Sequence, residues 1–438
     1  MALLLRLPLL GLPPTLSDDL LRYAWDGRVI ASGANPWRLA PTAAELAPLR
    51  DDLWRRLPHR EVPTVYPPLA LGAFSIAGSL PDGARLPALK TILVAADLGT
   101  CALLLALARR RGLPAARAAW YAWSPVVALE VAGMGHVDAL GAAAAVGAVL
   151  LLAPRRPAEG AEAASTPASE SPASSGDDPD RPRAAESAAA AGASDPDRPV
   201  SASVPGRPCP ARAVAAGAAA AAGILVKLAP AAALPMWARQ SGRPGRFLAA
   251  AVGLAVLGLA PVAASVGGAP PGLVAYGVSW EHAGALFEPL WRLLDRAGAA
   301  PALAGWLERA EAATGWYEAW DGVYPLLYPQ LLAKALLAAA AAALVARSLR
   351  EVDPVAGSRR LFGGLLIVSA TFYPWYLLWV LPFAALGRSA PWLLLAATSP
   401  LLYLPQLRDV GLFPGVWLAV WGPPAALAAA LAVARRRR

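Results

Sequence analysis

The sequence predicts an all-α fold, a polytopic transmembrane bundle of roughly 10–13 helices, several of them broken or re-entrant, with a large first extracytoplasmic loop. Hydrophobic residues make up 57% of the chain and charged residues 16%, whereas a soluble domain has about a quarter charged residues. The apolar residues form Leu/Ala/Val blocks of roughly 15 to 22 residues, close to the length that crosses a bilayer as helix. The blocks do not alternate with a period of two, which excludes a β-barrel.

Charge is distributed as in a membrane protein. The 438-residue chain has a formal net charge of +9, and its arginines lie between the apolar blocks and in a C-terminal run, Arg435 to Arg438. This pattern follows the positive-inside rule and differs from a nucleic-acid-binding surface. We therefore expect a multi-pass protein of the inner (cytoplasmic) membrane, in contact with the lipid bilayer, with a cytoplasmic C-terminus and no nucleic-acid partner.

Changes of composition divide the chain into seven segments. Residues 154–212 are rich in Ala, Pro, Ser and charged residues without periodicity, so we interpret them as a disordered, low-complexity cytoplasmic insert. The other expected segments are a truncated or short first transmembrane helix (1–14), the first extracytoplasmic loop (15–65), transmembrane helices (66–153 and 213–266), a second extracytoplasmic loop (267–324), and C-terminal transmembrane helices with a cytoplasmic Arg tail (325–438).

Three apolar segments contain helix-breaking or polar residues near their middles, and we expect each to form two short helices. The breaks fall at Gly133–Asp138, at Lys227 with Pro230, and at Tyr373–Tyr376. Counting inward from the C-terminus puts all three breaks on the outer face, together with the first loop. Polar groups at membrane depth are tolerated where they line a cavity, so one shared site is predicted. Residues 66–80 do not fit a full crossing and are interpreted as re-entrant or surface-lying.

The first loop contains the most informative motif. Ser17 and the pair Asp18–Asp19 are followed by Tyr23, Trp25 and Asp26. A serine before two aspartates also makes a favourable helix start, because carboxylates offset the positive end of the helix dipole. Capping alone does not explain why acidic, aromatic and Arg residues recur within one loop.

The ordered set of motifs resembles the GT-C superfamily of glycosyltransferases, and within it the bacterial polyprenol-phosphate-mannose-dependent mannosyltransferases and related polyprenyl-phospho-sugar transferases. The resemblance rests on Ser17–Trp37, Val62–Pro68, the Gly-His-Val-Asp of 135–138, Val226–Pro230 and Tyr373–Trp379. It covers most of the chain apart from the insert. Two features depart from the family pattern: Tyr373 stands where relatives often carry His, and the first helix is shorter.

The resemblance implies an inverting hexosyltransferase, with mannose the preferred sugar. Asp19 precedes Tyr23 by four residues, as in the family pattern, so it is our first candidate for the general base and Asp18 is the second. A carboxylate can accept the proton of an attacking sugar hydroxyl, and we expect the second acid nearby to raise the pKa of the base.

The remaining candidates divide into two groups. Lys227, Arg22 and His136 are candidates for the donor phosphate or lipid, because a leaving phosphate needs cations and an intramembrane lysine suggests function. Candidates for binding sugar or acceptor are Tyr23, Trp25, Asp26, Tyr66, Asp138, Tyr373, Trp375 and Tyr376.

Each motif has a structural alternative. Lys227 could snorkel to the interface, and His136 could be a packing histidine. The residues Tyr66-Pro67-Pro68 also form a favourable helix entry. The aromatics at 373–376 could belong to an interfacial belt.

No Gly-rich phosphate loop is visible, which favours a lipid-linked donor over a nucleotide sugar. The expected partners are a polyprenyl-phospho-sugar donor and a glycan, glycolipid or protein acceptor. No cofactor is certain: Asp18, Asp19, Asp138 and Glu281 could hold a divalent cation, but they lack ligand spacing. The rival interpretation is a transporter or lipid-linked glycan flippase, which also uses broken helices, although no internal repeat is evident.

Overall fold

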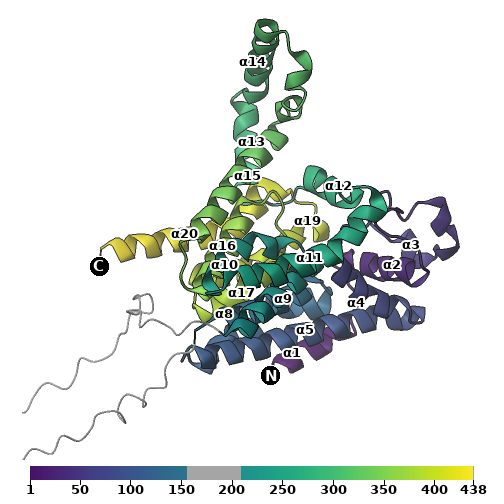
Figure 1. Cartoon of the computed structure of the whole chain (residues 1–438), viewed down its shortest axis with the longest axis vertical. Helices are drawn as coiled ribbons and strands as arrows, with labels where there is room; N and C mark the ends of the chain where they lie inside the picture. Colours follow the sequence, from purple (N-terminus) through teal and green to yellow (C-terminus); the bar gives the residue numbers. More distant parts are fainter. Residues whose placement is uncertain (155–208, 438) are drawn as a thin grey trace, which may run out of the picture.

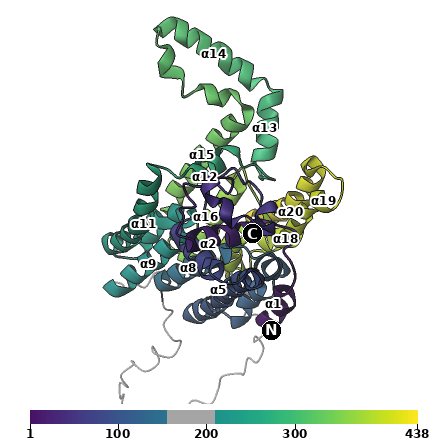
Figure 2. The same ribbon diagram turned by 90° about the vertical axis from the view of Figure 1, so that its right-hand side faces the viewer.

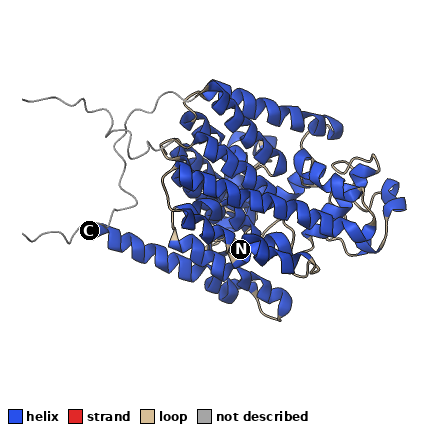
Figure 3. Cartoon of the chain, turned by 90° about the horizontal axis from the view of Figure 1, so that it is seen from below, coloured by secondary structure: helices blue, strands red, loops and turns tan. Residues whose placement is uncertain are grey.

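The computed structural model describes residues 1–154 and 209–437. The described residues form helices and loops and no strand (Figure 3), which confirms the all-α fold class. The insert expected at 154–212 lies outside the described residues over 155–208.

The first half of the chain begins with a short helix and the loop helices. Its helices are α1 (Ala2–Leu10), α2 (Asp19–Ala31), the 3₁₀ helix η1 (Ala44–Leu49), α3 (Asp52–Arg55), α4 (Pro68–Gly78), α5 (Asp82–Arg110), the 3₁₀ helix η2 (Ala115–Ala118), α6 (Ala119–Ala122), α7 (Pro125–Ala128), the π-helical turn η3 (Leu129–Gly133) and α8 (Asp138–Leu152).

The second half continues the bundle. Its helices are α9 (Pro210–Val226), η4 (Ala229–Ala233), α10 (Leu234–Gln240), α11 (Pro244–Val266), α12 (Pro271–Ser279), α13 (Phe287–Arg296), α14 (Ala299–Thr314), η5 (Tyr317–Trp320), η6 (Tyr324–Leu327), α15 (Pro329–Ser348), α16 (Pro354–Val368), η7 (Pro374–Trp379), α17 (Leu381–Leu386), α18 (Ala390–Thr398), η8 (Ser399–Tyr403), α19 (Leu404–Leu407), η9 (Leu412–Val416) and α20 (Trp417–Arg436).

Four helices in the described part of the chain are long and apolar enough to cross a membrane: Asp82–Arg110, Pro244–Val266, Pro329–Ser348 and Leu412–Arg436. Helices α4, α8 and α9 are apolar but shorter, with 11, 15 and 17 residues. Helices of 15 to 17 residues extend only about 23 to 26 Å at 1.5 Å per residue. Since the bilayer core is about 30 Å thick, these helices are shorter than a full crossing.

The expected breaks are present. The chain leaves helix between η3 and α8 at Met134–Val137, at Lys227, which is extended with φ −158° and ψ 137°, and at Ser369–Tyr373 before η7. Each break frees backbone groups from helical hydrogen bonding and turns side chains toward the interior of the bundle. The first two breaks lie where the sequence predicted them, whereas the third lies at Ser369–Tyr373, because Pro374–Tyr376 already belong to η7.

Helix α2 lies directly against α4. A Cβ added to Gly27 would come within 2.1 Å of the carbonyl oxygen of Phe74, and one added to Gly78 within 2.2 Å of the backbone of Gly27. Only glycine permits two helix backbones to approach this closely. This crossing fixes the axis of α2, whose first residue is Asp19.

Most of the segment expected as a second outer loop is helical. Helices α13 and α14 project away from the bundle, whereas α12 stays beside the first loop (Figures 1 and 2). A Cβ on Gly272 of α12 would meet the carbonyl oxygen of Pro63 at 2.3 Å. The two segments expected to form outer loops are thus in direct backbone contact.

A buried ion pair fastens α1 to the bundle. Nε of Arg6 lies 2.7 Å from Oδ2 of Asp97 on α5, both side chains have no exposed surface, and the hydroxyl of Tyr121 donates to Oδ1 of Asp97 at 2.8 Å. The guanidinium also donates to the carbonyl of Ala122. The short first helix is therefore held by polar contacts in addition to apolar packing.

Replacing Asp97 with Asn should lower the free energy of unfolding by about 3–5 kcal/mol, because Arg6 is left as a buried charge without its counterion. The measurement is the unfolding midpoint of the purified protein in detergent. Asp52→Asn is the matched control, since the side chain of Asp52 is 90% exposed in its pair with Arg55 and exposed pairs contribute little. Equal midpoints for the two variants would contradict this account.

Candidate active site

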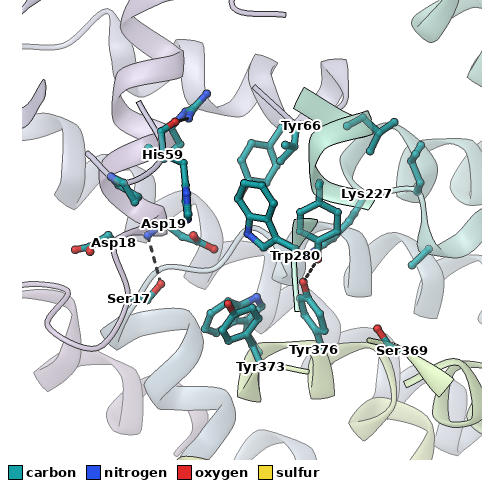
Figure 4. Close-up of a pocket in the computed structure, with 18 of the residues that line it drawn as sticks. Ser17, Asp18, Asp19, His59, Tyr66, Lys227, Trp280, Ser369, Tyr373 and Tyr376 are labelled. Atoms are coloured by element: carbon teal, nitrogen blue, oxygen red, sulfur yellow. Dashed lines mark hydrogen bonds between the residues drawn. The ribbon is translucent and has the colours of Figure 1, made fainter. Parts of the chain in front are cut away.

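One large cavity lies where the broken helices meet the first loop. Its volume is about 610 Å³. It is lined by residues of the first loop, the Lys227 break, α12 and its C-terminal end, α16 and the η7 region (Figure 4). Of the predicted site residues, the lining includes Asp18, Asp19, Arg22, Tyr66, Lys227, Tyr373, Trp375 and Tyr376.

Asp19 occupies the first turn of α2, and Asp18 is the N-cap residue. The motif therefore both starts a helix and lines the cavity. The side chain of Asp19 is 33% exposed, and its Oδ2 accepts a hydrogen bond of 3.4 Å from the hydroxyl of Tyr23 one turn later. The four-residue spacing thus places Tyr23 on the same helix face as Asp19. Asp18 is more exposed and also lines the cavity.

His136 reaches Asp19 because of a tight turn. Gly135 has φ +79°, which favours glycine, and a Cβ there would meet a methyl of Leu20 at 2.8 Å. The backbone N–H of His136 donates to the carbonyl of Glu130 at 3.0 Å. This turn places Nδ1 of His136 3.6 Å from Oδ2 of Asp19.

His136 ends a column of stacked rings. Its imidazole lies 3.8 Å from the ring centre of Trp375, Trp375 stacks on Tyr373 at 4.3 Å, and Tyr373 stacks on His282 at 4.4 Å. The interplanar angles are 15°, 3° and 12°. The 267–324 segment, the η7 region and the Gly-His-Val-Asp motif are joined through this column.

The carboxyl group of Asp19 is held in its ionised form. Burial alone would raise its pKa, but the neighbouring imidazole of His136, together with the charge of Lys227, brings the pKa of Asp19 below its ordinary value. The expectation that the neighbouring Asp18 raises this pKa is therefore wrong. Asp19 is available as a proton acceptor at neutral pH, and its position, not a raised pKa, would favour reaction.

The second charged group is an ion pair. Nζ of Lys227 lies 2.9 and 3.0 Å from the two carboxylate oxygens of Asp138, which has no exposed side-chain surface, and 4.4 Å from the ring centre of Tyr376. Nε1 of Trp379 donates to the same carboxylate at 2.6 Å. The side chain of Lys227 remains 27% exposed, on the opposite side of the labelled aromatic residues from Asp19 (Figure 4).

Four of the predicted sugar- or acceptor-binding residues do not line the cavity: Tyr23, Trp25, Asp26 and Asp138. Trp25 is fully buried in a separate apolar cluster with Leu21 and Val29. Asp26 is 1% exposed and accepts hydrogen bonds from Arg22 at 2.9 Å and Thr64 at 2.6 Å. Their positions give them a structural role within the first loop, because no exposed surface of either side chain faces a ligand.

Arg22 lines the cavity but its hydrogen-bonding capacity is used within the loop. Besides Asp26, its guanidinium donates to the carbonyl oxygens of His59 at 3.2 Å and Val62 at 2.8 Å. Tyr23 is 1% exposed and stacks on Phe74 at 4.4 Å. Through these contacts, Arg22 and Tyr23 support the cavity wall. Asp138 also lies behind the wall, where it orients Lys227.

Several residues that line the cavity were not predicted from the sequence. Tyr276 and Trp280 come from the end of the α12 segment, the hydroxyl of Tyr276 shares a hydrogen bond with that of Tyr376, and His59 lies 4.5 Å from the ring of Trp280. These contacts depend on how the 15–65 and 267–324 segments pack against each other. Glu130 was also not predicted as a site residue, although a carboxylate inside an apolar segment is itself a signal of function.

No group of three or more His, Cys, Asp or Glu side chains in the described ranges is arranged to hold a metal ion. Asp18 and Asp19 lie at the cavity, whereas Asp138 is engaged by Lys227 and Glu281 by Lys334 at 2.9 Å. Of the four acids named as possible cation ligands, two lie at the cavity and two are paired with lysines.

The comparison with known proteins decides the family. A family model described as "Alpha-(1->6)-mannopyranosyltransferase, N-terminal domain" matches residues 1–240. The chain belongs to this family. Membership agrees with the GT-C mannosyltransferase resemblance, and the matched half contains Asp19, His136, Asp138 and Lys227, whereas the aromatic wall at 373–376 lies outside it. No curated protein and no solved structure matches the chain.

Replacing His136 with Gln should make activity more sensitive to acid. The substitution removes the main group that lowers the pKa of Asp19, so that pKa should rise. Because the carboxylate is the active form, the loss of mannosyl transfer on acidification should then begin at higher pH. The measurement is the pH dependence of kcat/KM for both proteins, and an acid limb that moves to lower pH would contradict the assignment.

Proposed function

We propose that this family member transfers mannose from a polyprenyl-phosphate-linked donor to a sugar hydroxyl by an inverting mechanism at the outer face of the cytoplasmic membrane. The observation that carries the proposal is the pairing, in one cavity, of a carboxylate held ionised and a lysine set in a helix break. Asp19 and Lys227 come from segments more than two hundred residues apart. A transferase needs both a proton acceptor and a cation for the leaving group.

The charged end of the donor fits the Lys227 side. The ammonium group carries three donors, of which Asp138 takes part of the capacity. The exposed part of the side chain faces the cavity and can donate to phosphate oxygens. His136 lies on the Asp19 side, so we assign it to the base and not to the phosphate.

A second cavity fits the lipid. Its volume is about 240 Å³, and it shares Val65, Tyr66, Pro67, Leu228 and Leu273 with the wall of the main cavity. The rest of its lining is apolar and comes from Trp37, Pro68 and the ends of α11 and α12. Since Leu228 follows Lys227, a phosphate at Lys227 would place the first isoprenoid unit next to this cavity. The hydrophobic effect would favour that position.

The chemical step follows from these positions. An acceptor hydroxyl oxygen attacks C1 of mannose, its proton passes to a carboxylate oxygen of Asp19, and the bond between C1 and the phosphate oxygen breaks. The lipid phosphate leaves with its added charge near Lys227. Inversion at C1 that yields the α-(1→6) linkage of the family description requires a β-linked donor and the primary 6-hydroxyl of the acceptor.

The proposed orientation follows the arginines. Arg111, after α5, forms a two-point contact with Asp353 at the start of α16, with one N–O distance of 2.6 Å. Burial would raise the pKa of Asp353, but Arg111 brings it below the ordinary value. These residues lie in loops expected to be cytoplasmic under the positive-inside rule. The cavity, formed at the opposite breaks, would then face outward in a multi-pass arrangement.

Asp19→Asn should reduce kcat for mannosyl transfer by about 10²–10⁴-fold, because the amide cannot accept the proton. Asp18→Asn is the comparison, since Asp18 lines the same cavity one residue earlier. The assay is transfer from polyprenyl-phospho-mannose to an acceptor with a free 6-hydroxyl, with the anomeric configuration of the product determined by NMR.

A larger loss in Asp18→Asn than in Asp19→Asn would move the role of base to Asp18. No transfer by the wild type from any polyprenyl-phospho-sugar, combined with flux of lipid-linked glycan in proteoliposomes, would replace the transferase proposal with a flippase.

Lys227→Met should raise the KM for the donor by about 10–100-fold, since a hydrogen bond to a charged group contributes about 1.5–3 kcal/mol. The variant is best combined with Asp138→Asn, so that no buried carboxylate is left without a cation. Lys334→Met is the control, because Lys334 pairs with Glu281 and does not line the cavity. An unchanged KM for the polyprenyl donor in the Lys227 variants would exclude this phosphate site.

A further inference from the structure

A buried carboxylate that the transfer reaction leaves without a role lies directly behind the proposed base. Glu130 is 1% exposed, although it stands in an apolar segment of a membrane protein. Its Oε2 is 3.2 Å from Nε2 of His136, whose Nδ1 is 3.6 Å from Asp19. The three side chains therefore form a line in which a single imidazole separates two carboxylates.

The local fold holds Glu130 in this line. The π-helical turn η3 contains Glu130, and the backbone turn at Gly135 brings His136 back over it, with the 3.0 Å hydrogen bond from the backbone N–H of His136 to the carbonyl of Glu130. From the far end of the chain, the hydroxyl of Tyr403 lies 2.9 Å from both carboxylate oxygens of Glu130. One hydroxyl proton can serve only one oxygen at a time, so the second oxygen stays available to His136.

The groups around His136 come from three elements. Asp19 faces it from α2, Glu130 from η3, and Trp375 of η7 covers one ring face. The imidazole has no exposed side-chain surface, and neither ring nitrogen makes a hydrogen bond of good geometry in the present arrangement. Only the doubly protonated ring can donate toward both carboxylates at once. A neutral ring would leave one carboxylate facing a lone pair.

We propose that Glu130 is a positioning residue: it holds His136 as the imidazolium that in turn keeps Asp19 in the proton-accepting form. Without the carboxylate of Glu130, a protonated His136 would have only Asp19 as a counter-charge. Because His136 is buried, the neutral imidazole would then be favoured. Asp19 would then lose its nearest cation. The inference rests on the proposed function only in calling Asp19 the base, because the electrostatic arrangement itself can be tested without transfer.

The direction in which the pKa of Asp19 moves when the charge of Glu130 is removed distinguishes this role from a simple charge effect. Deleting a nearby negative charge should by itself make Asp19 more acidic. If Glu130 acts by maintaining the imidazolium, deleting its charge should instead make Asp19 less acidic. The two explanations therefore predict movement in opposite directions.

The experiment measures modification of Asp19 by a hydrophobic carbodiimide, which reacts with protonated carboxyl groups, as a function of pH. The full-length protein in detergent is used, and fragment-ion mass spectrometry separates Asp19 from Asp18. In Glu130→Gln the midpoint of Asp19 modification should move up by about one pH unit. Tyr403→Phe removes only the hydroxyl that orients Glu130 and should move the midpoint in the same direction by less. It also provides the test if Glu130→Gln does not fold.

Asp97→Asn is the matched control, because Asp97 is likewise a buried carboxylate with a cation and a tyrosine hydroxyl as partners, away from the cavity. It should leave the Asp19 midpoint unchanged even though it destabilises the fold. A midpoint in Glu130→Gln and Tyr403→Phe that is unchanged or moves down would overturn the inference.

Kinetics keep this inference separate from the proposed function. Glu130→Gln should move the acid limb of kcat for mannosyl transfer to higher pH by about one pH unit, with kcat near neutral pH and the KM for the polyprenyl donor unchanged, because only the protonation of Asp19 is affected. If the midpoint shifts as expected but the wild type transfers no sugar, the transferase proposal fails and the Glu130–His136–Asp19 arrangement stands. If transfer requires Asp19 but the midpoint does not move, the arrangement fails and the transferase proposal stands.

Discussion

The structure depends on the pairing of buried charges across helix breaks. A charge inside a membrane protein is tolerated only when a partner or a cavity compensates for lost hydration. Here Asp138 holds Lys227, His136 lies between Asp19 and Glu130, and Arg6 holds Asp97. The first two sets lie at breaks, so the places where helices stop are also the places where separate parts of the chain meet.

The breaks and the close helix contacts have complementary effects. Glycines at 27 and 78 bring α2 against α4, which fixes the helix that begins at Asp19, while the turn at Gly135 directs His136 toward that residue. The aromatic column from His136 to His282 then connects this turn to the second outer loop. Rigid neighbours on several sides are what a proton acceptor needs, since geometry must be maintained while substrates exchange.

The two ends of the cavity differ in charge and in surroundings. The Asp19 end has a carboxylate with His136 behind it, and the Lys227 end has an ammonium group beside an apolar second cavity. Such separation suits a reaction in which a neutral hydroxyl is deprotonated at one end and a lipid phosphate departs at the other. The family match, which covers the half of the chain carrying these charged residues, is consistent with this division of roles.

The sequence by itself determined the all-α membrane fold and predicted a break in each of three apolar segments. It also proposed Asp19, His136, Asp138 and Lys227 as members of one site, of which Asp19 and Lys227 line the cavity. Composition, apolar period and helix-breaking residues are local properties, so they can be read along the chain. Only the tertiary structure showed that Trp25 and Asp26 pack within the loop, that Asp138 serves Lys227, and that the pKa of Asp19 falls. Those outcomes depend on distances between residues remote in sequence, such as Tyr403 and Glu130, and electrostatic effects follow distance in space and not separation along the chain.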